Sequence, residues 1–250
     1  MASASDYVHL ILDFGNTRDK YAVFQPDGIQ FRHTLEERLS PETLEHLLKD
    51  LKPTAAILSS TAAERPELRR QLMDSLPFVH LTHETPVPFQ NAYATPETLG
   101  RDRIAAIAGV RNHVADGAVL VVDAGTCVTY DLLDSSDVYH GGAIAPGIRL
   151  RLNAMHTFTA RLPLVDWDAS STVELIGDST ENSLLSGAVL GTAAEIDSIA
   201  ARYAERFENL HVLLTGGDAV ALQACLKSRI FAVPNLVAEG LNKILIHNVF

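Results

Sequence analysis

The sequence predicts an α/β protein made of two halves of the same design. Segments with strand-like alternation take turns with segments of helical periodicity, a pattern typical of helices layered on sheets. One apolar strand ends in Asp13-x-Gly15, and another ends in Asp123-x-Gly125, 110 residues later, each followed directly by a second strand. A chain of 250 residues forms one large domain or two small ones. The repeat favours two domains, residues 1–116 and 117–250.

In the first half, strand, turn and helix signals follow one another in order. Two strands are expected over residues 7–14 and 20–25, on either side of the Asp13 turn. Ser40 is suited to cap a helix that begins at Pro41, because leucines recur behind it at helical spacing. The other elements expected here are strands at 28–34 and 54–61, helices at 65–76 and 100–114, and an irregular proline-containing segment at 84–100.

The second half begins again with a strand–turn–strand unit over residues 117–134. A helix is expected after Gly147, a long helix over 182–206, a strand at 211–215, and two further helices with a short strand between them. Gly187 and Gly191 lie four residues apart on the long helix. They would allow close packing against another helix, either within the subunit or in a second copy.

The composition excludes several classes of protein. A formal net charge of -11 with only five lysines argues against a nucleic-acid surface, although not against nucleotides whose phosphates a divalent cation neutralises. No uncharged apolar run approaches the ~20 residues that span a bilayer, and the N-terminal residues do not form a signal peptide. The two cysteines fit no disulfide or metal framework. We therefore expect a cytoplasmic protein without a membrane or nucleic-acid partner.

Several familiar motifs do not occur in the chain. G-x-x-x-x-G-K-[ST], G-x-G-x-x-G and G-x-S-x-G are absent, and the ten histidines show no spacing typical of zinc ligands. The pair of acid–glycine turns remains. Glycine lets backbone amides approach an anion, and an adjacent carboxylate can hold the hydrated Mg²⁺ that phosphates share. The alternative is that both are ordinary hairpin turns.

Six segments along nearly the whole chain resemble, in order, those of the type III pantothenate kinases, also called the Bvg accessory factor family. They are DFGNTRDKYAVF, NAYATPETLGRDRIAAIAG, VVDAGTCVTYDLLD, YHGGAIAPGIRL, STENSLLSGAVLGTAAEID and LLTGGDA. That family belongs to the acetate and sugar kinase, Hsc70 and actin superfamily. The resemblance implies two duplicated actin-like, ribonuclease H-like ATPase domains with a nucleotide cleft between them.

The resemblance also implies how this fold would hold ATP. Asp13 would hold Mg²⁺ through ATP, and Asp123 would bind a monovalent cation, K⁺ or NH₄⁺. The expected nucleotide contacts are Asp13, Phe14, Gly15, Asn16, Thr17, Arg18, Asp19, Lys20 and Thr126.

A second set of residues would hold pantothenate by the same resemblance, and Asp102 would be the general base that accepts the hydroxyl proton. Arg103 is suited to the pantothenate carboxylate. The expected pocket residues are Tyr93, Gly100, Arg101, Asp102, Arg103 and Thr180. The alternative for this segment is a charged first helical turn. Arg101 departs from the family, which commonly has alanine at this position. Because of this departure, a substrate other than pantothenate stays an open alternative.

The implied reaction is ATP-dependent phosphorylation of pantothenate to 4′-phosphopantothenate, the first step of coenzyme A synthesis, by a homodimer. Two other functions stay open. The chain could be a non-catalytic regulatory member of the family, or a kinase for another small alcohol. A filament-forming actin relative is disfavoured, because the chain is short for that protein's extra subdomains.

Overall fold

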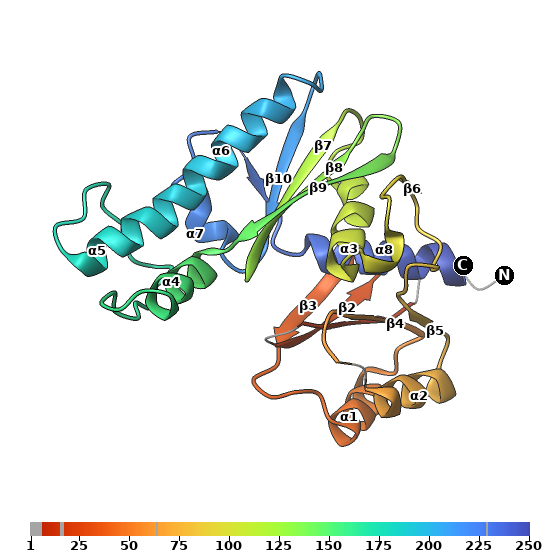
Figure 1. Ribbon diagram of the computed structural model, residues 1–250. Helices are drawn as coiled ribbons and strands as arrows, with labels where there is room; N and C mark the ends of the chain where they lie inside the picture. Colours follow the sequence, from red (N-terminus) through yellow and green to blue (C-terminus); the bar gives the residue numbers. More distant parts are fainter. Residues whose placement is uncertain (1–6, 16–17, 64, 229) are drawn as a thin grey trace. The chain divides into compact units, whose positions relative to one another are not determined.

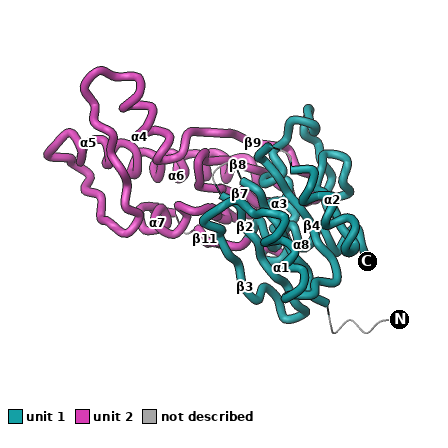
Figure 2. The backbone as a smooth tube through the Cα atoms, turned by 90° about the horizontal axis from the view of Figure 1, so that it is seen from below, with its two compact units in different colours: residues 1–113, 236–250 teal, residues 114–235 magenta. Residues whose placement is uncertain are grey.

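The computed structural model describes residues 7–15, 18–63, 65–228 and 230–250, and its helices and strands alternate along the chain (Figure 1). It divides into two compact units (Figure 2). Unit 1 contains residues 1–113 and 236–250, and unit 2 contains residues 114–235. Each unit is built around five strands of a sheet, with helices of its own.

The sheet of unit 1 has the strand order β3-β2-β1-β4-β5. Strand β1 pairs antiparallel with β2, which pairs antiparallel with β3, whereas β4 runs parallel to both β1 and β5. The carboxyl ends of β1 and β4 therefore meet at one edge. The strands are β1 (His9–Phe14), β2 (Asp19–Gln25), β3 (Gly28–Thr34), β4 (Ala55–Ser60) and β5 (Phe78–His80).

Helices cover both faces of this sheet (Figure 1). Helices α1 (Pro41–Leu51) and α2 (Pro66–Ser75) lie on one face, and α3 (Arg101–Gly109) and α8 (Leu236–Val249) on the other. As the sequence predicts, the Ser40 hydroxyl accepts a hydrogen bond from the Thr43 amide at 3.1 Å and caps α1. The segment before α3 holds strand β6 (Gln90–Asn91) and a 3₁₀ turn (Pro96–Thr98), and a second 3₁₀ turn (Val110–Asn112) follows α3.

Helix α8 packs with unit 1, although the sequence interpretation assigned residues 117–250 to the second domain. The reason is a close crossing of α8 with α3. A Cβ atom on Gly240 would lie 1.7 Å from the Ala105 carbonyl oxygen, and one on Gly109 would lie 2.7 Å from that of Leu236. Only glycine permits backbones to approach so closely. The last 15 residues thus complete unit 1.

Unit 2 repeats the topology of unit 1. When the strands are numbered within each unit, both units have the order third, second, first, fourth, fifth. In unit 2 this is the order β9-β8-β7-β10-β11, and the parallel and antiparallel pairs are the same as in unit 1. This finding confirms the predicted duplication. The strands are β7 (Val119–Ala124), β8 (Cys127–Leu133), β9 (Val138–Pro146), β10 (His211–Thr215) and β11 (Phe231–Ala232).

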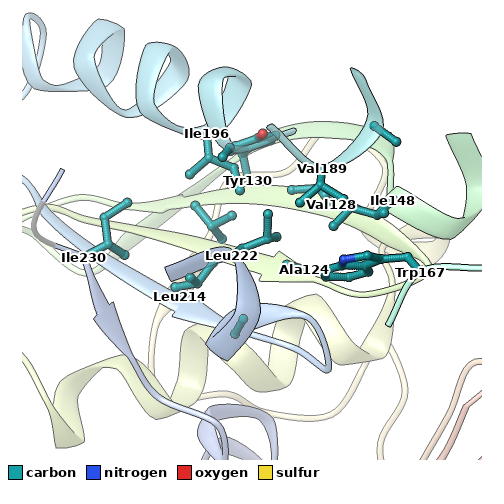
Figure 3. Packing of buried hydrophobic residues seen from close by; sticks show 14 of the residues in the cluster. Ala124, Val128, Tyr130, Ile148, Trp167, Val189, Ile196, Leu214, Leu222 and Ile230 are labelled. Carbon is teal, nitrogen blue, oxygen red and sulfur yellow. The ribbon is translucent and has the colours of Figure 1, made fainter. Parts of the chain in front are cut away.

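The core of unit 2 joins its helices to the sheet (Figure 3). Val128 and Tyr130 of β8 pack in one cluster with Ile196 of α6 and Leu222 of α7. Helices α5 and α6 form one long helix, interrupted by a π-helical turn at Ser186–Leu190 (Figure 1). The helices are α4 (Ile148–Thr157), α5 (Thr180–Leu185), α6 (Gly191–Ala204) and α7 (Ala219–Gln223).

Among the described residues, one helix, Thr180–Ala204, is long and apolar enough to cross a membrane by length and composition alone. Its buried side chains, including Leu184, Val189 and Ile196, belong to the core cluster of unit 2. Core helices of water-soluble domains often have this composition.

Candidate active site

Asp13 lies at the carboxyl end of β1 and on the face of the sheet that α3 covers. Successive side chains of a strand alternate between faces. Leu10, Leu12 and Phe14 belong to the core cluster beneath α1 and α2. Asp13 therefore points to the other face. Its strand partners are Lys20 on β2 and Ser59 on β4.

The surroundings of Asp13 disfavour its negative charge. Burial raises its pKa to about 6, even though the residue keeps some exposed surface. Lys20 opposes the rise in pKa, Asp102 adds to it, and Arg32 and the Ser59 hydroxyl oppose it more weakly. The interaction with Asp102 shows that the fold brings the two acids, 89 residues apart in sequence, into one electrostatic environment. A carboxylate in such a place gains from a nearby cation.

Asp102 lies in the first turn of α3, where the helix dipole favours negative charge. Its Oδ1 atom accepts a hydrogen bond from the Arg103 amide at 2.9 Å. Gly100 precedes the helix with φ of −56° and ψ of 133°, angles that any residue adopts. A Cβ atom at this position would lie 2.5 Å from Asp102 Oδ1, so a side chain here would push the carboxylate from its place.

Replacing Gly100 with alanine should therefore displace the Asp102 carboxylate without preventing the fold. We expect kcat to fall about 10-fold to 100-fold, the cost of misplacing a reacting group by about 1 Å. Steady-state kinetics with a thermal unfolding curve checks this. The matched control is Gly191→Ala, since a Cβ atom at Gly191 meets nothing within 4 Å. Equal activity of the Gly100 variant and the wild type would contradict the account.

The predicted substrate residues near Asp102 occupy different environments. Arg103 is buried, and its guanidinium carbon lies 5.6 Å from the centre of the Tyr93 ring, within the range of a cation–π contact. Arg101 is partly buried and donates a hydrogen bond to the Leu99 carbonyl at 2.9 Å. Tyr93, Gly100, Arg101, Asp102 and Arg103 are thus all in unit 1.

The residues at the turn after β1 differ in how far their side chains are exposed. Gly15 and the exposed Arg18 close it through a hydrogen bond from the Gly15 amide to the Arg18 carbonyl at 3.1 Å. The Phe14 side chain is buried, and the Arg65 guanidinium lies 3.8 Å above its ring. The buried Phe14 side chain therefore anchors the start of the turn in the core of unit 1. The predicted contacts Asn16 and Thr17 lie outside the described residues.

Asp19 and Lys20 point to opposite faces of the sheet, because neighbours in a strand do so. Lys20 is opposite Asp13. The Asp19 side chain is fully buried and accepts hydrogen bonds from Arg38, Arg65 and the Leu39 amide. Burial alone would raise the pKa of Asp19, but these donors outweigh it and the pKa lies below its ordinary value. The sequence reasoning missed the roles of Arg38 and Arg65.

Asp123 of unit 2 repeats the position of Asp13, at the carboxyl end of β7. Gly216, which follows β10, has φ of +98°, and a Cβ atom there would lie 2.4 Å from Asp123 Oδ1 and 2.2 Å from the Ala124 carbonyl oxygen. A side chain at Gly216 would therefore crowd the carboxylate. This glycine of the LLTGG segment leaves room for Asp123.

The turn after Asp123 is held by the segment before α4. The Gly147 amide donates a hydrogen bond to the Thr126 carbonyl at 3.1 Å, and a Cβ atom on Gly147 would lie 2.2 Å from the Gly125 carbonyl oxygen. Thr126 itself is exposed at the tip. Its hydroxyl is thus accessible to a ligand.

Thr180, the last predicted substrate residue, belongs to unit 2 and is the first residue of α5. It lines a cavity of about 580 Å³ together with Gly177, Ser179, Leu184 and Gly187. Its walls include hydroxyl groups, apolar side chains and the carboxylate of Asp178.

No group of three or more His, Cys, Asp or Glu side chains suited to a metal ion occurs in the part of the chain that the structure describes.

Solved structures define the class of protein. A Baf family protein from Campylobacter jejuni superposes with a TM-score of 0.61 at 23% identity, over 96% of this chain and 98% of that one. The ROK hexokinase from Thermus thermophilus superposes with a TM-score of 0.53 at 14% identity, over 97% and 100%. The repeated sheets and their acid–glycine turns thus form an actin-like ATPase fold, shared with ROK sugar kinases.

Sequence comparison then defines the family. The profile of the type III pantothenate kinases matches residues 9–202. The type III pantothenate kinase of Christiangramia forsetii is 42% identical over 242 residues, which cover 96% of this chain and 99% of that protein. That of Phocaeicola vulgatus is 40% identical over 245 residues, with coverage of 96% and 99%. This chain belongs to the type III pantothenate kinase family.

Proposed function

We propose that this protein transfers the γ-phosphoryl group of ATP to pantothenate, giving ADP and 4′-phosphopantothenate. Family membership supports the reaction. The single structural observation that supports it is the electrostatic interaction of Asp102 with Asp13 in unit 1, because phosphoryl transfer to an alcohol needs a proton acceptor near the nucleotide phosphates.

Asp102 is the proposed general base. The 4′-hydroxyl oxygen of pantothenate forms a bond to the γ-phosphorus, and the bond between that phosphorus and the bridging oxygen breaks to release ADP. The hydroxyl proton passes to the Asp102 carboxylate. Gly100 leaves the space in which this carboxylate sits, and the Arg103 amide fixes its orientation.

The proposed nucleotide contacts come from the turn after β1 and from Thr126. Lys20, opposite Asp13, supplies a positive charge beside the turn. Asp13 would hold Mg²⁺ through ATP, and this ion would neutralise charge that develops on the phosphates. Asp123 would hold a monovalent cation, K⁺ or NH₄⁺, beside the turn of unit 2.

Pantothenate would be held by the segment that precedes and begins α3. Arg103 offers a guanidinium to its carboxylate, and Tyr93 lies against that guanidinium. Arg101 donates a hydrogen bond to the Leu99 carbonyl, so its side chain lies against the same segment. Thr180 is the proposed contact from unit 2.

A homodimer in the cytoplasm is the proposed form of the enzyme. Exposed apolar side chains gather in the segments that border the Thr180 cavity, which supports an interface there. They are Phe158, Leu164, Leu175 and Ile176. Sedimentation velocity would test the oligomeric state, and a monomer at micromolar concentration would exclude the dimer.

The reaction is tested by ADP release from purified protein with MgATP and pantothenate. Potassium and sodium should be compared as the only monovalent cation. We expect turnover with potassium and much less with sodium. Binding of ATP without turnover under either condition would favour a regulatory member of the family. Turnover with another small alcohol alone would show that the substrate is different.

A further inference from the structure

We propose that Arg38 is a positioning residue for the nucleotide turn, which it holds from the side away from Asp13. The proposal rests on the proposed function, in which this turn contacts ATP. Arg38 lies in the segment after β3 and belongs to no helix or strand. No nucleotide-binding role is assigned to it by the sequence motifs.

One nitrogen of Arg38 joins the two ends of the turn. Its Nη1 atom donates to the Gly15 carbonyl at 2.6 Å and to Asp19 Oδ1 at 2.7 Å. A guanidinium Nη atom carries two hydrogens, so one nitrogen can make both bonds. Because the peptide group is planar, holding the Gly15 carbonyl also fixes the orientation of the peptide group that contains it.

Asp19 makes this a rigid support. Its buried carboxylate receives three donors, since the Arg65 Nη1 atom and the Leu39 amide bind Oδ2 at 2.7 Å and 2.9 Å. Hydrogen bonds to a buried carboxylate are strong, because the charge has no water to replace them. Arg38 thus links the Gly15 carbonyl to a buried carboxylate of unit 1.

The fold depends on Arg38 less than the conformation of the turn does. Its side chain is 46% exposed, and without it Asp19 keeps Arg65 and Leu39 as partners. The Gly15 carbonyl would be accessible to water instead. Losing Arg38 should therefore loosen the turn before ATP binds. The cost of ordering the turn then reduces the affinity for the nucleotide.

The test measures binding of a non-hydrolysable ATP analogue with Mg²⁺ by calorimetry, alongside kinetics. Arg38→Ala should weaken binding about tenfold, in the range that a single charge-assisted hydrogen bond supports. It should raise KM for ATP by a similar factor and leave KM for pantothenate unchanged. Arg38→Lys, which keeps a cation within reach of Asp19, should recover part of the affinity.

Two control variants separate positioning from other effects. Arg70→Ala removes the same charge from an exposed site and should bind as the wild type does. Arg65→Ala weakens the support of Asp19 without touching Gly15, and it should lower the melting temperature more than Arg38→Ala because it also loses the stacking on Phe14.

Wild-type affinity in Arg38→Ala would overturn the proposal, as would equal losses of affinity in the Arg38 and Arg65 variants. If the wild type fails to bind the analogue, the proposed function fails instead. Binding with turnover of another alcohol would leave the role of Arg38 intact.

Discussion

Asp102→Asn should abolish most turnover while leaving the binding of MgATP in place. General-base catalysis typically contributes ~10²–10⁴-fold in rate, and we expect kcat to fall within that range. Asparagine keeps the Oδ1 atom that accepts the Arg103 amide, so the start of α3 should remain intact. The variant should also bind MgATP at least as tightly, because Asp102 contributes to the raised pKa of Asp13.

The measurement for Asp102→Asn is kcat and nucleotide affinity on the same preparation. A merely structural role would reduce both quantities together and would lower the melting temperature. Turnover within threefold of the wild type would exclude Asp102 as the base.

Asp13→Asn should remove activity and stabilise the protein. We expect kcat/KM for ATP to fall at least about 100-fold, the size of effect seen when a charged group that supports the transition state is lost. The folded state raises the pKa of Asp13 from 3.8 to about 6. At neutral pH this rise lowers the free energy of unfolding by about 3 kcal/mol. The variant should gain a large part of this amount, because asparagine avoids the burial of a charge.

The pH dependence of stability follows from the same pKa. The folded state binds the proton of Asp13 more tightly than the unfolded state does, so the contribution of Asp13 is most favourable below pH 3.8. It is lost as the pH rises through about 6. Urea unfolding at pH 5 and pH 8 should show a gain for Asp13→Asn that is larger at pH 8. A gain that is equal at both values would contradict the raised pKa of Asp13.

Local patterns predict most of the fold. The sequence patterns predict most of the strands but not β5 or β9, and the repeated acid–glycine turn predicts the duplication that the strand orders of the two units show. The assignment of the C-terminal helix could not follow from such patterns. It depends on the crossing of Gly109 and Gly240, which are 131 residues apart in sequence.

In the candidate site too, some features follow from local sequence patterns and others depend on contacts between distant segments. Asp13 and Lys20 lie on the two strands that the sequence predicts around the turn, and the structure places them opposite each other. The observed strand begins one residue earlier than predicted, at Asp19, and so places Asp19 on the other face from Lys20. The partner of Asp19 could not be predicted, because Arg38 lies in a segment without helical or strand periodicity.

The most direct test of the central claim is mass spectrometry of the reaction products after incubation with MgATP, pantothenate and potassium. The account predicts that pantothenate gains one phosphoryl group and that ADP appears in equal amount, and that Asp102→Asn forms both products at least about 100-fold more slowly. ADP without phosphorylated pantothenate, or unmodified ATP and pantothenate with the folded wild type, would contradict it.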